Sequence, residues 1–213
     1  MTPARIAVLD YDAGNLRSAA KALTRAGADV TVTADAAEAS RADALVVPGV
    51  GHFGQCVRRF RAAGLEALAQ DWVAADRPLL GICVGMQILY AASEEEPVTR
   101  GLGVLPGQVR RLPDDVTVPH MGWNVVTPVR PDPLLKGIGG QRCYFVHSYY
   151  AAPSDDAHVL ATCDYGPGFP CVVRVGHTVG TQFHPEKSAA VGGRLLTNFV
   201  SAVASRSVGV GSP

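Results

Sequence analysis

The chain has 213 residues, 47% of them hydrophobic, and its 19 Lys and Arg residues balance 19 Asp and Glu residues. This length fits one α/β domain with a core of its own, and zero net charge argues against nucleic-acid and anionic-membrane binding. No apolar run approaches the roughly 20 residues that span a bilayer, and residues 1–5 lead directly into a short strand. We therefore expect a cytoplasmic protein without a signal or transit peptide.

The first half of the chain alternates apolar strands with helical patterns. Strands are expected at residues 5–10, 29–33, 42–47 and 78–82, and helices at 15–26, 34–40 and 53–75, with a break at Gly64. Four such alternations predict an α/β fold with a mostly parallel, doubly wound, flavodoxin-like sheet. Ligands bind such sheets beyond the carboxyl ends of the strands, near a reversal of strand order.

From residue 101 to 181 the pattern changes to short β-like runs between Gly, Pro and Asp turns. The runs are 107–112, 122–129, 141–150, 158–163, 171–175 and 179–183. They predict an added antiparallel β region, made of strands and hairpins joined to the parallel sheet. A helix at 188–204 would complete a single domain spanning residues 1–204, and residues 205–213 would form a loose tail.

The chain has five cysteines, and no two of them form a C-x-x-C pair. This pattern predicts neither a disulfide framework nor a zinc site. We expect no metal and no cofactor. Four of the cysteines are expected to be packed or partly exposed thiols in a reducing compartment, namely Cys56, Cys143, Cys163 and Cys171.

The fifth cysteine, Cys83, lies in the most informative segment of the chain. The apolar strand at 78–82 runs into a Gly-x-Cys-x-Gly turn, and a helical pattern follows immediately. Gly81 and Gly85 are expected there because strand and helix pack too closely for side chains. The amino end of that helix would favour thiolate over thiol at Cys83. Such an arrangement is typical of proteins that use the sulfur in covalent chemistry.

A cysteine nucleophile needs a base that accepts its proton and a third group that orients the base. His184 and Glu186 supply both at a spacing of two, and Pro185 between them stiffens the backbone. Taken singly, Cys83 is compatible with a small buried hydrophobe and His184 with a core histidine. Together, each at the end of an apolar strand, they predict a catalytic triad of Cys83, His184 and Glu186.

Three segments resemble the signatures of the triad, or class I, glutamine amidotransferases: Pro48-Gly49-Val50-Gly51, Gly81-Ile82-Cys83-Val84-Gly85-Met86-Gln87 and His184-Pro185-Glu186-Lys187-Ser188. Their order and separation match over nearly the whole chain. Three further segments resemble the glutaminase subunits of imidazole glycerol phosphate synthases: Asp10-Tyr11-Asp12-Ala13-Gly14-Asn15-Leu16, Pro119-His120-Met121-Gly122-Trp123-Asn124 and Phe145-Val146-His147-Ser148-Tyr149. The segment around Trp123 is the most distinctive of them.

The resemblance implies an enzyme that hydrolyses glutamine to glutamate and ammonia through a thioester on Cys83. Each step passes through an oxyanion, which fixed N–H donors must stabilise. The Val84 N–H is one candidate, and the loop that contains Val50 and Gly51 is expected to supply the second. Without the resemblance, that loop fits an ordinary strand-to-helix turn.

The resemblance also implies how the amino-acid end of glutamine is held. Gln87 lies one helical turn beyond Cys83, on the same side of the helix. By similarity, the segment 147–149 contacts the α-carboxylate and α-amino groups, although a polar strand edge is the alternative. The expected substrate-binding residues are Gly49, Gly51, Gln87, His147, Ser148 and Tyr149.

A partner is implied as well, because ammonia released to solvent is mostly protonated and is then not a nucleophile. By resemblance, the partner is a cyclase subunit of (β/α)8-barrel fold, which forms a heterodimer with this chain. It would make imidazole glycerol phosphate and an aminoimidazole carboxamide nucleotide in histidine biosynthesis. The expected interface residues are Asp12, Asn15, Trp123 and Lys187. The run Glu94-Glu95-Glu96 is expected to be a solvated loop.

Three alternatives remain open. The first is a glutaminase for another acceptor, as in GMP, anthranilate or carbamoyl phosphate synthesis, and the segment 119–124 argues against it. The second is a cysteine peptidase or other hydrolase on a similar fold, in which the segment 184–188 would be unexpected. The third is a flavodoxin-like binding module, which needs a phosphate-binding Gly-rich loop after the first strand; Gly14 alone is not one.

Overall fold

Eight strands form the central sheet, in the order β2-β1-β3-β4-β12-β11-β10-β7. The computed structural model describes the backbone of residues 2–209 and the side chains of residues 2–206. The first five strands of this order run parallel to one another. They are β2 (Asp29–Thr33), β1 (Arg5–Leu9), β3 (Ala44–Gly49), β4 (Leu79–Cys83) and β12 (Thr178–Thr181). The predicted α/β fold with a mostly parallel sheet is confirmed.

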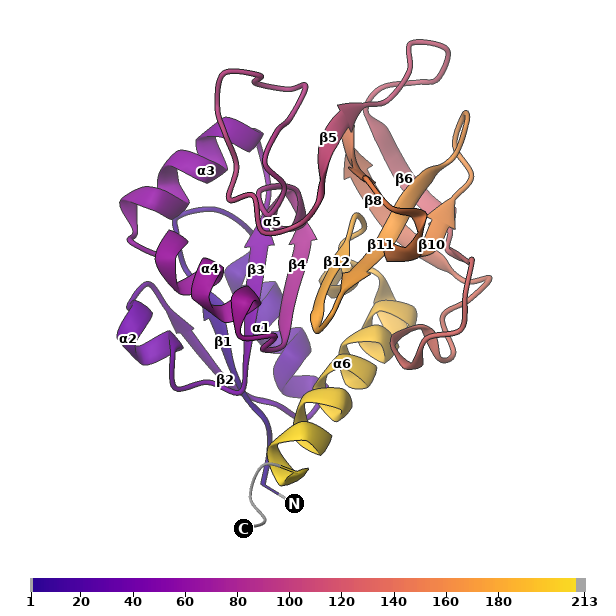
Figure 1. Cartoon of the computed structure of the whole chain (residues 1–213). Coiled ribbons are helices and arrows are strands. Elements are labelled where there is room, and N and C mark those ends of the chain that lie inside the picture. Colours follow the sequence, from indigo (N-terminus) through magenta and orange to yellow (C-terminus); the bar gives the residue numbers. More distant parts are fainter. Residues whose placement is uncertain (1, 210–213) are drawn as a thin grey trace.

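The remaining central strands run antiparallel: β11 (Phe169–Val175), β10 (Val159–Cys163) and β7 (Thr127–Pro128). Two small antiparallel sheets pair β5 (Gly107–Arg111) with β9 (Tyr149–Pro153) and β6 (His120–Val125) with β8 (Arg142–His147). Most of these strands lie together on the side of the molecule away from α2–α4 (Figure 1). The predicted antiparallel β region is therefore present.

Three of the expected strand runs differ in the structure. The run 141–150 breaks at Ser148 into β8 and β9, and the run 122–129 divides into β6 and β7. The run 179–183 was expected among antiparallel hairpins, but β12 also pairs in parallel with β4. Short-range alternation shows which residues share a face, but it carries no information on the neighbouring strand.

The helices pack around the parallel strands (Figure 1). They are α1 (Leu16–Arg25), α2 (Ala36–Ala39), α3 (Phe53–Ala62), α4 (Glu66–Ala74), α5 (Val84–Gln87) and α6 (Ala189–Gly209), with short 3-10 turns η1 (Pro133–Leu135), η2 (Asp156–His158) and η3 (Pro185–Lys187). The tail expected to be loose from residue 205 is helical as far as Gly209, because α6 continues past residue 204. Residues 210–213 lie outside the described residues.

Local sequence explains where the first helix begins and ends. The Asn15 side chain accepts a hydrogen bond from the Ser18 N–H at 3.4 Å, which caps α1. Gly27 follows the helix with a φ of +97°, a conformation that glycine adopts without the penalty of a Cβ atom. Because α1 begins beside the carboxyl end of β1, its amino end lies at the same sheet edge as Cys83.

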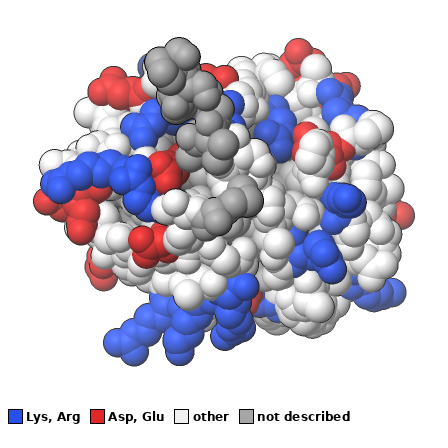
Figure 2. Space-filling model, turned by 90° about the horizontal axis from the view of Figure 1, so that it is seen from below, with Lys and Arg blue, Asp and Glu red and all other residues white. Residues whose placement is uncertain are grey.

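The start of β1 and the end of α6 lie at the bottom of the sheet, opposite the edge where β4 meets α5 (Figure 1). On the face of the molecule seen from below, Lys and Arg side chains are interspersed with Asp and Glu side chains, in keeping with a net charge of zero (Figure 2). Among the described residues, no helix has both the length and the hydropathy that a membrane span requires.

Close backbone packing at α5 leads to a stability prediction. A Cβ atom on Gly85 would lie 1.9 Å from the Val47 carbonyl oxygen, so we expect Gly85→Ala to lower the free energy of unfolding by about 1–3 kcal/mol or more. Chemical denaturation measures this change. Gly193→Ala in α6 is the matched control, because its Cβ would meet nothing within 4 Å. Equal denaturation midpoints for Gly85→Ala and wild type would contradict the prediction.

Candidate active site

Cys83 ends β4 at a sharp bend of the backbone. Its φ of 54° and ψ of −118° are unusual for a residue with a side chain, and strain of this kind is common at functional sites. The two flanking glycines are required, since a Cβ on Gly81 would lie 2.6 Å from the Met86 Cα. However, α5 is a single turn, so its macrodipole is smaller than the expected helix would supply.

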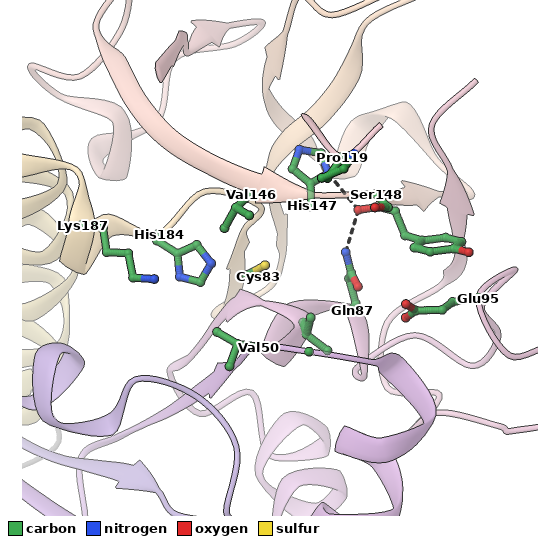
Figure 3. Close-up of a pocket in the computed structure, with 13 residues that line it drawn as sticks. Val50, Cys83, Gln87, Glu95, Pro119, Val146, His147, Ser148, His184 and Lys187 are labelled. Carbon is green, nitrogen blue, oxygen red and sulfur yellow. Dashed lines mark hydrogen bonds between the residues drawn. The ribbon is translucent and has the colours of Figure 1, made fainter. Parts of the chain in front are cut away.

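His184 and Glu186 form a buried pair beside Cys83. The His184 Nδ1 lies 2.8 Å from Glu186 Oε1, and their side chains are only 2% and 3% exposed. The Nδ1–H group donates to the carboxylate, so Nε2 is the ring nitrogen that can exchange a proton with other groups. His184 Nε2 has no hydrogen-bond partner among the described residues. Cys83 and His184 line the same cavity (Figure 3).

The charge of His184 depends on its neighbours. Burial lowers the pKa of His184, but interactions with the Cys83 sulfur and the Glu186 carboxylate outweigh burial and raise the pKa to about 9. An imidazole with this pKa is protonated at neutral pH and places a positive charge beside the Cys83 sulfur. The pair therefore has the electrostatic arrangement of an activated cysteine nucleophile.

This raised pKa predicts a pH dependence of stability. Because the pKa of His184 rises from 6.5 to about 9 on folding, protonated His184 stabilises the fold below about pH 6.5. That contribution is lost as the pH rises through about 9. We expect the stability advantage of wild type over His184→Gln to shrink between about pH 6.5 and 9 in denaturation experiments. A difference that stays constant over this range would contradict the prediction.

A cavity of about 410 Å³ opens next to the triad, a size that suits a small ligand (Figure 3). Ten of the predicted site residues line it: Val50, Gly51, Cys83, Val84, Gln87, His147, Ser148, Tyr149, His184 and Lys187. Glu95, Pro119 and Val146 line it as well. Pro119 and Val146 belong to the segments that resemble the family but were given no role, and Glu95 was expected in a solvated loop. Gly49 does not line the cavity. It packs on α5 instead: a Cβ atom added to Gly49 would lie 2.2 Å from the Gly85 nitrogen.

Gln87 and His147 both form hydrogen bonds with the Tyr149 carbonyl oxygen (Figure 3). Gln87 Nε2 donates to this oxygen at 2.8 Å and to Gln182 Oε1 at 3.1 Å, so both amide hydrogens are used and only Gln87 Oε1 is free for a ligand. His147 Nδ1 lies 2.9 Å from the same carbonyl, and Nε2 lies 3.0 Å from His120 Nδ1. His147 therefore supports the cavity wall and has no free ring nitrogen to offer.

Burial keeps the two histidines neutral. It lowers the pKa of His120. Burial, and second the repulsion between two protonated rings if His120 were also charged, lower the pKa of His147 to about 3. Neutral rings form a one-way chain in which His120 donates to His147 and His147 donates to the Tyr149 carbonyl. This chain holds the backbone at the end of β8 in place.

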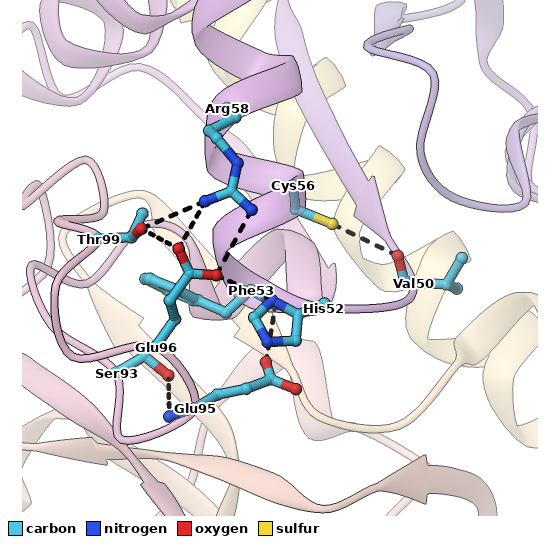
Figure 4. A network of polar contacts seen from close by, with 9 residues as sticks. All are labelled: Val50, His52, Phe53, Cys56, Arg58, Ser93, Glu95, Glu96 and Thr99. Carbon is cyan, nitrogen blue, oxygen red and sulfur yellow. Dashed lines mark hydrogen bonds and ion pairs between the residues drawn. The ribbon is translucent and has the colours of Figure 1, made fainter.

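The expected loop at residues 94–96 is present and Glu94 is exposed, but Glu95 and Glu96 are half-buried and all three side chains make specific contacts. Glu94 accepts a hydrogen bond from the Arg111 N–H at 2.8 Å, and Glu96 pairs with Arg58 and His52 (Figure 4). Glu95 accepts from the Phe53 N–H at 2.7 Å and lines the cavity. Three consecutive glutamates carry no local signature of these contacts, because their partners lie on α3 and β5.

The loop between β3 and α3 forms the wall opposite His147. The Val50 carbonyl accepts a hydrogen bond from the Cys56 thiol at 3.4 Å (Figure 4). Because a trans peptide directs its carbonyl and N–H to opposite sides, the Gly51 N–H points away from Cys56. Gly51 has a φ of +95°, which favours glycine. Burial raises the pKa of Cys56 to about 11, so it stays a protonated donor.

The remaining cysteines fit the expectation for reduced, packed thiols. All five cysteines of the chain are free and buried. Burial raises the pKa of Cys143 to about 11 and that of Cys163 to about 12, and it raises the pKa of Cys171 further. These three thiols are therefore protonated at neutral pH and lie outside the cavity.

The predicted interface residues lie outside or at the rim of the cavity. Asp12 is exposed and pairs with Arg59 at 3.5 Å, and Asn15 caps α1. Trp123 is 47% exposed on β6, so it does not fill the core. Lys187 is exposed and lines the cavity mouth. Two further apolar side chains are exposed: Val50, which lines the cavity, at 40%, and Met121, which lies opposite the cavity-lining Val146 in the β6–β8 pair, at 67%.

The chain belongs to the class I glutamine amidotransferase family, whose model matches residues 7–203. More specific relatives carry the name imidazole glycerol phosphate synthase subunit HisH. The chain is 48% identical over 207 residues to that of Halobacterium salinarum, which covers 92% of this chain and 93% of the relative. It is 45% identical over 210 residues to that of Geobacillus kaustophilus, with coverages of 96% and 100%.

Solved structures agree on the fold. A crystal structure of a glutamine amidotransferase superposes with a TM-score of 0.75 at 24% identity, covering 93% of this chain and 98% of the other. A putative GMP synthase protein from Thermoplasma acidophilum superposes with a TM-score of 0.72 at 19% identity, covering 99% of both chains. The predicted resemblance to class I glutamine amidotransferases, and to the glutaminase subunits of imidazole glycerol phosphate synthases, is confirmed.

Proposed function

We propose that this chain is the glutaminase subunit of an imidazole glycerol phosphate synthase and acts in histidine biosynthesis. Sequence identity of 45–48% to HisH subunits over almost the whole chain supports this acceptor rather than GMP, anthranilate or carbamoyl phosphate. The observation that carries the chemistry is that Cys83 and His184 line one cavity while Glu186 holds His184 Nδ1 at 2.8 Å.

The reaction begins when Cys83 Sγ attacks the side-chain amide carbon of glutamine and the carbonyl electron pair moves to oxygen. His184 gives its Nε2 proton to the leaving nitrogen, so that ammonia departs and a γ-glutamyl thioester remains. Neutral His184 then takes a proton from water, whose oxygen attacks the thioester carbon. The C–S bond breaks, its electron pair returns to sulfur, and glutamate leaves. Glu186 holds the imidazole in the required tautomer throughout.

Two backbone N–H groups are proposed to stabilise the oxyanion. The Val84 N–H begins α5, where the first N–H groups of a helix have no intrahelical partner. The loop of Val50 and Gly51 provides the second donor from the opposite wall of the same cavity. The Cys56 thiol supports this arrangement, because it holds the Val50 carbonyl on the other side of the peptide.

The hydrogen-bond acceptors that are free in the cavity support a proposed orientation of the glutamine substrate. Gln87 Oε1 is free to accept, and so is Glu95 Oε1, because the Phe53 N–H occupies only Glu95 Oε2; this suits the α-ammonium group of glutamine. Ser148 and Tyr149 line the cavity. The Ser148 hydroxyl and the Tyr149 backbone N–H are proposed to donate to the α-carboxylate. His147 contributes by fixing the Tyr149 carbonyl rather than by touching the substrate.

We expect Glu95→Gln to raise the KM for glutamine by about tenfold to a hundredfold with little change in kcat, because a hydrogen bond to a charged group is lost. Steady-state kinetics of glutamate release measure both constants. Glu94→Gln is the matched control, since Glu94 neighbours Glu95 but does not line the cavity. Equal KM values for Glu95→Gln and wild type would contradict the proposed orientation.

The partner is proposed to be a cyclase subunit of (β/α)8-barrel fold that covers the rim of the cavity. Trp123, Met121 and Val50 offer apolar contact there, and Trp side chains are frequent anchors at interface centres. Lys187 at the cavity mouth and Asp12 at the β1–α1 turn add charged contacts. Five free cysteines are consistent with the reducing cytoplasm, which stays our expectation for the location.

Glutamate release tests the proposed function most directly. The chain is assayed alone and then with the cyclase and one of the cyclase ligands, with ammonia incorporation into imidazole glycerol phosphate as the second readout. We expect glutamate release in the complex to match product formation one to one. Glutamate release without incorporation would contradict the assigned acceptor, and no glutamate release in the complex would contradict the glutaminase itself.

A further inference from the structure

A buried amide beside the nucleophile is not used in the reaction described above. Gln182 is fully buried, and its Nε2 donates to Cys83 Sγ at 3.6 Å. Sulfur accepts hydrogen bonds over longer distances than oxygen does, and a thiolate is a much better acceptor than a thiol. A neutral buried amide at this position therefore interacts more strongly with the ionised form of Cys83.

The orientation of the Gln182 amide is determined by its other contacts. Its Oε1 accepts from Gln87 Nε2 at 3.1 Å, and Gln87 Nε2 in turn donates its second hydrogen to the Tyr149 carbonyl. The backbone is held too, since the Gln182 N–H donates to the Cys171 carbonyl at 2.9 Å. With Oε1 occupied by a donor, the amide nitrogen necessarily faces the sulfur.

The backbone explains why Gln182 and His184 both reach Cys83. β12 pairs in parallel with β4, with Thr181 opposite Ile82, so the residues that follow each strand emerge side by side. In extended backbone, alternate side chains share a face. Phe183 between them points into the core, where it is fully buried and packs on Phe145 at 5.6 Å between ring centroids. One short segment thus places an amide and an imidazole around one sulfur atom.

We propose that Gln182 is a positioning residue that donates a hydrogen bond to the Cys83 thiolate, both before attack and when the thiolate leaves the thioester. This inference rests on the proposed function. When the thioester C–S bond breaks, the electron pair returns to sulfur, and the fixed amide N–H stabilises that charge without reorganisation. Through Gln87, the same amide is linked to the end of the cavity that is proposed to bind the substrate ammonium group.

The test compares the complex with the cyclase for wild type, Gln182→Met and Gln182→Glu. Methionine has a similar length and no donor, whereas glutamate keeps an acceptor for Gln87 and replaces the donor by negative charge. The first readout is the pH dependence of iodoacetamide alkylation at Cys83, followed by the mass of the Cys83 peptide. The second is kcat and KM for glutamine. Gln70→Met, at an exposed position in α4, is the matched control.

We expect the midpoint pH of Cys83 alkylation to rise by about one unit in Gln182→Met and by more in Gln182→Glu. At neutral pH, kcat should fall by about tenfold in both variants. KM should stay nearly unchanged in Gln182→Glu, which keeps the contact with Gln87, because the hydrogen bond to Cys83 reaches the nucleophile and not the substrate. A role in packing alone would lower the melting temperature without moving the alkylation midpoint. The other titratable groups around Cys83 are the same in all variants: Tyr11, Cys56, Glu95, His147, His184 and Lys187.

An unchanged alkylation midpoint in a folded Gln182 variant would overturn this inference while leaving the glutaminase intact. If Gln182→Met does not fold, Gln182→Glu gives the same comparison, because it preserves the contact with Gln87. The proposed function fails separately, when the wild-type complex releases no glutamate or keeps its activity after Cys83 is alkylated.

Discussion

Replacement of Cys83 by Ala is expected to abolish glutamate release, with a fall of about ten-thousandfold or more in kcat. No other side chain takes over the covalent step, because the remaining described cysteines are buried thiols outside the cavity. Without the cysteine nucleophile, water would have to attack the side-chain amide of glutamine directly. An amide is far less reactive toward water than a thioester is. The measurement is glutamate release by the complex with the cyclase under saturating glutamine.

The Cys83→Ala variant should still fold and bind its partner, since its backbone conformation and the flanking glycines are unchanged. Cys163→Ala is the matched control: it also removes a buried thiol, but away from the cavity, and should keep wild-type kcat with some loss of stability. Glutamate release by Cys83→Ala at the wild-type rate would contradict the covalent mechanism.

Replacement of Glu186 by Gln is expected to lower kcat by about a thousandfold to ten-thousandfold, with little change in KM. The carboxylate accepts from His184 Nδ1 at 2.8 Å inside the protein, so no water replaces it. A neutral amide neither stabilises imidazolium nor enforces the tautomer with Nε2 directed to the cavity. Because Glu186 contributes to the raised pKa of His184, that pKa should fall in the variant.

The pH profile of kcat tests this explanation beyond the loss of rate. In the Glu186→Gln variant, the limb of the profile that reports His184 should move to lower pH than in wild type. Glu66→Gln is the matched control, since it removes a carboxylate that pairs with Arg61 at 2.9 Å on the surface. A variant that retains the wild-type kcat would show that the carboxylate does not orient the base.

Much of the site is predictable from short segments. The elbow at Cys83 needs a strand, two glycines and a turn, all within a few residues, so it is visible as a local pattern. The spacing of His184 and Glu186 is likewise local. The same holds for α1, whose cap at Asn15 and stop at Gly27 depend on neighbouring residues alone.

Glu95 and Gln182 show what local pattern cannot reveal. Glu95 sits in a run of glutamates that has the composition of a solvated loop, yet it is held by the Phe53 N–H of α3. Gln182 is an ordinary polar residue at a strand end, and its neighbours Cys83 and Gln87 are far away in sequence. No sequence spacing of Glu or Gln residues predicts contacts with residues that are distant in the chain.

The amino-acid sequence by itself determined the strand and helix alternation, the bend that presents Cys83, and the pairing of His184 with Glu186, because each depends on sterics and hydrogen bonds between near neighbours. Only the tertiary structure decided that β12 lies parallel to β4 and that residues 141–150 divide between two sheets. Strand neighbours are selected by burial and hydrogen bonding summed over the whole chain. That selection brings residues 182–184 to the sulfur.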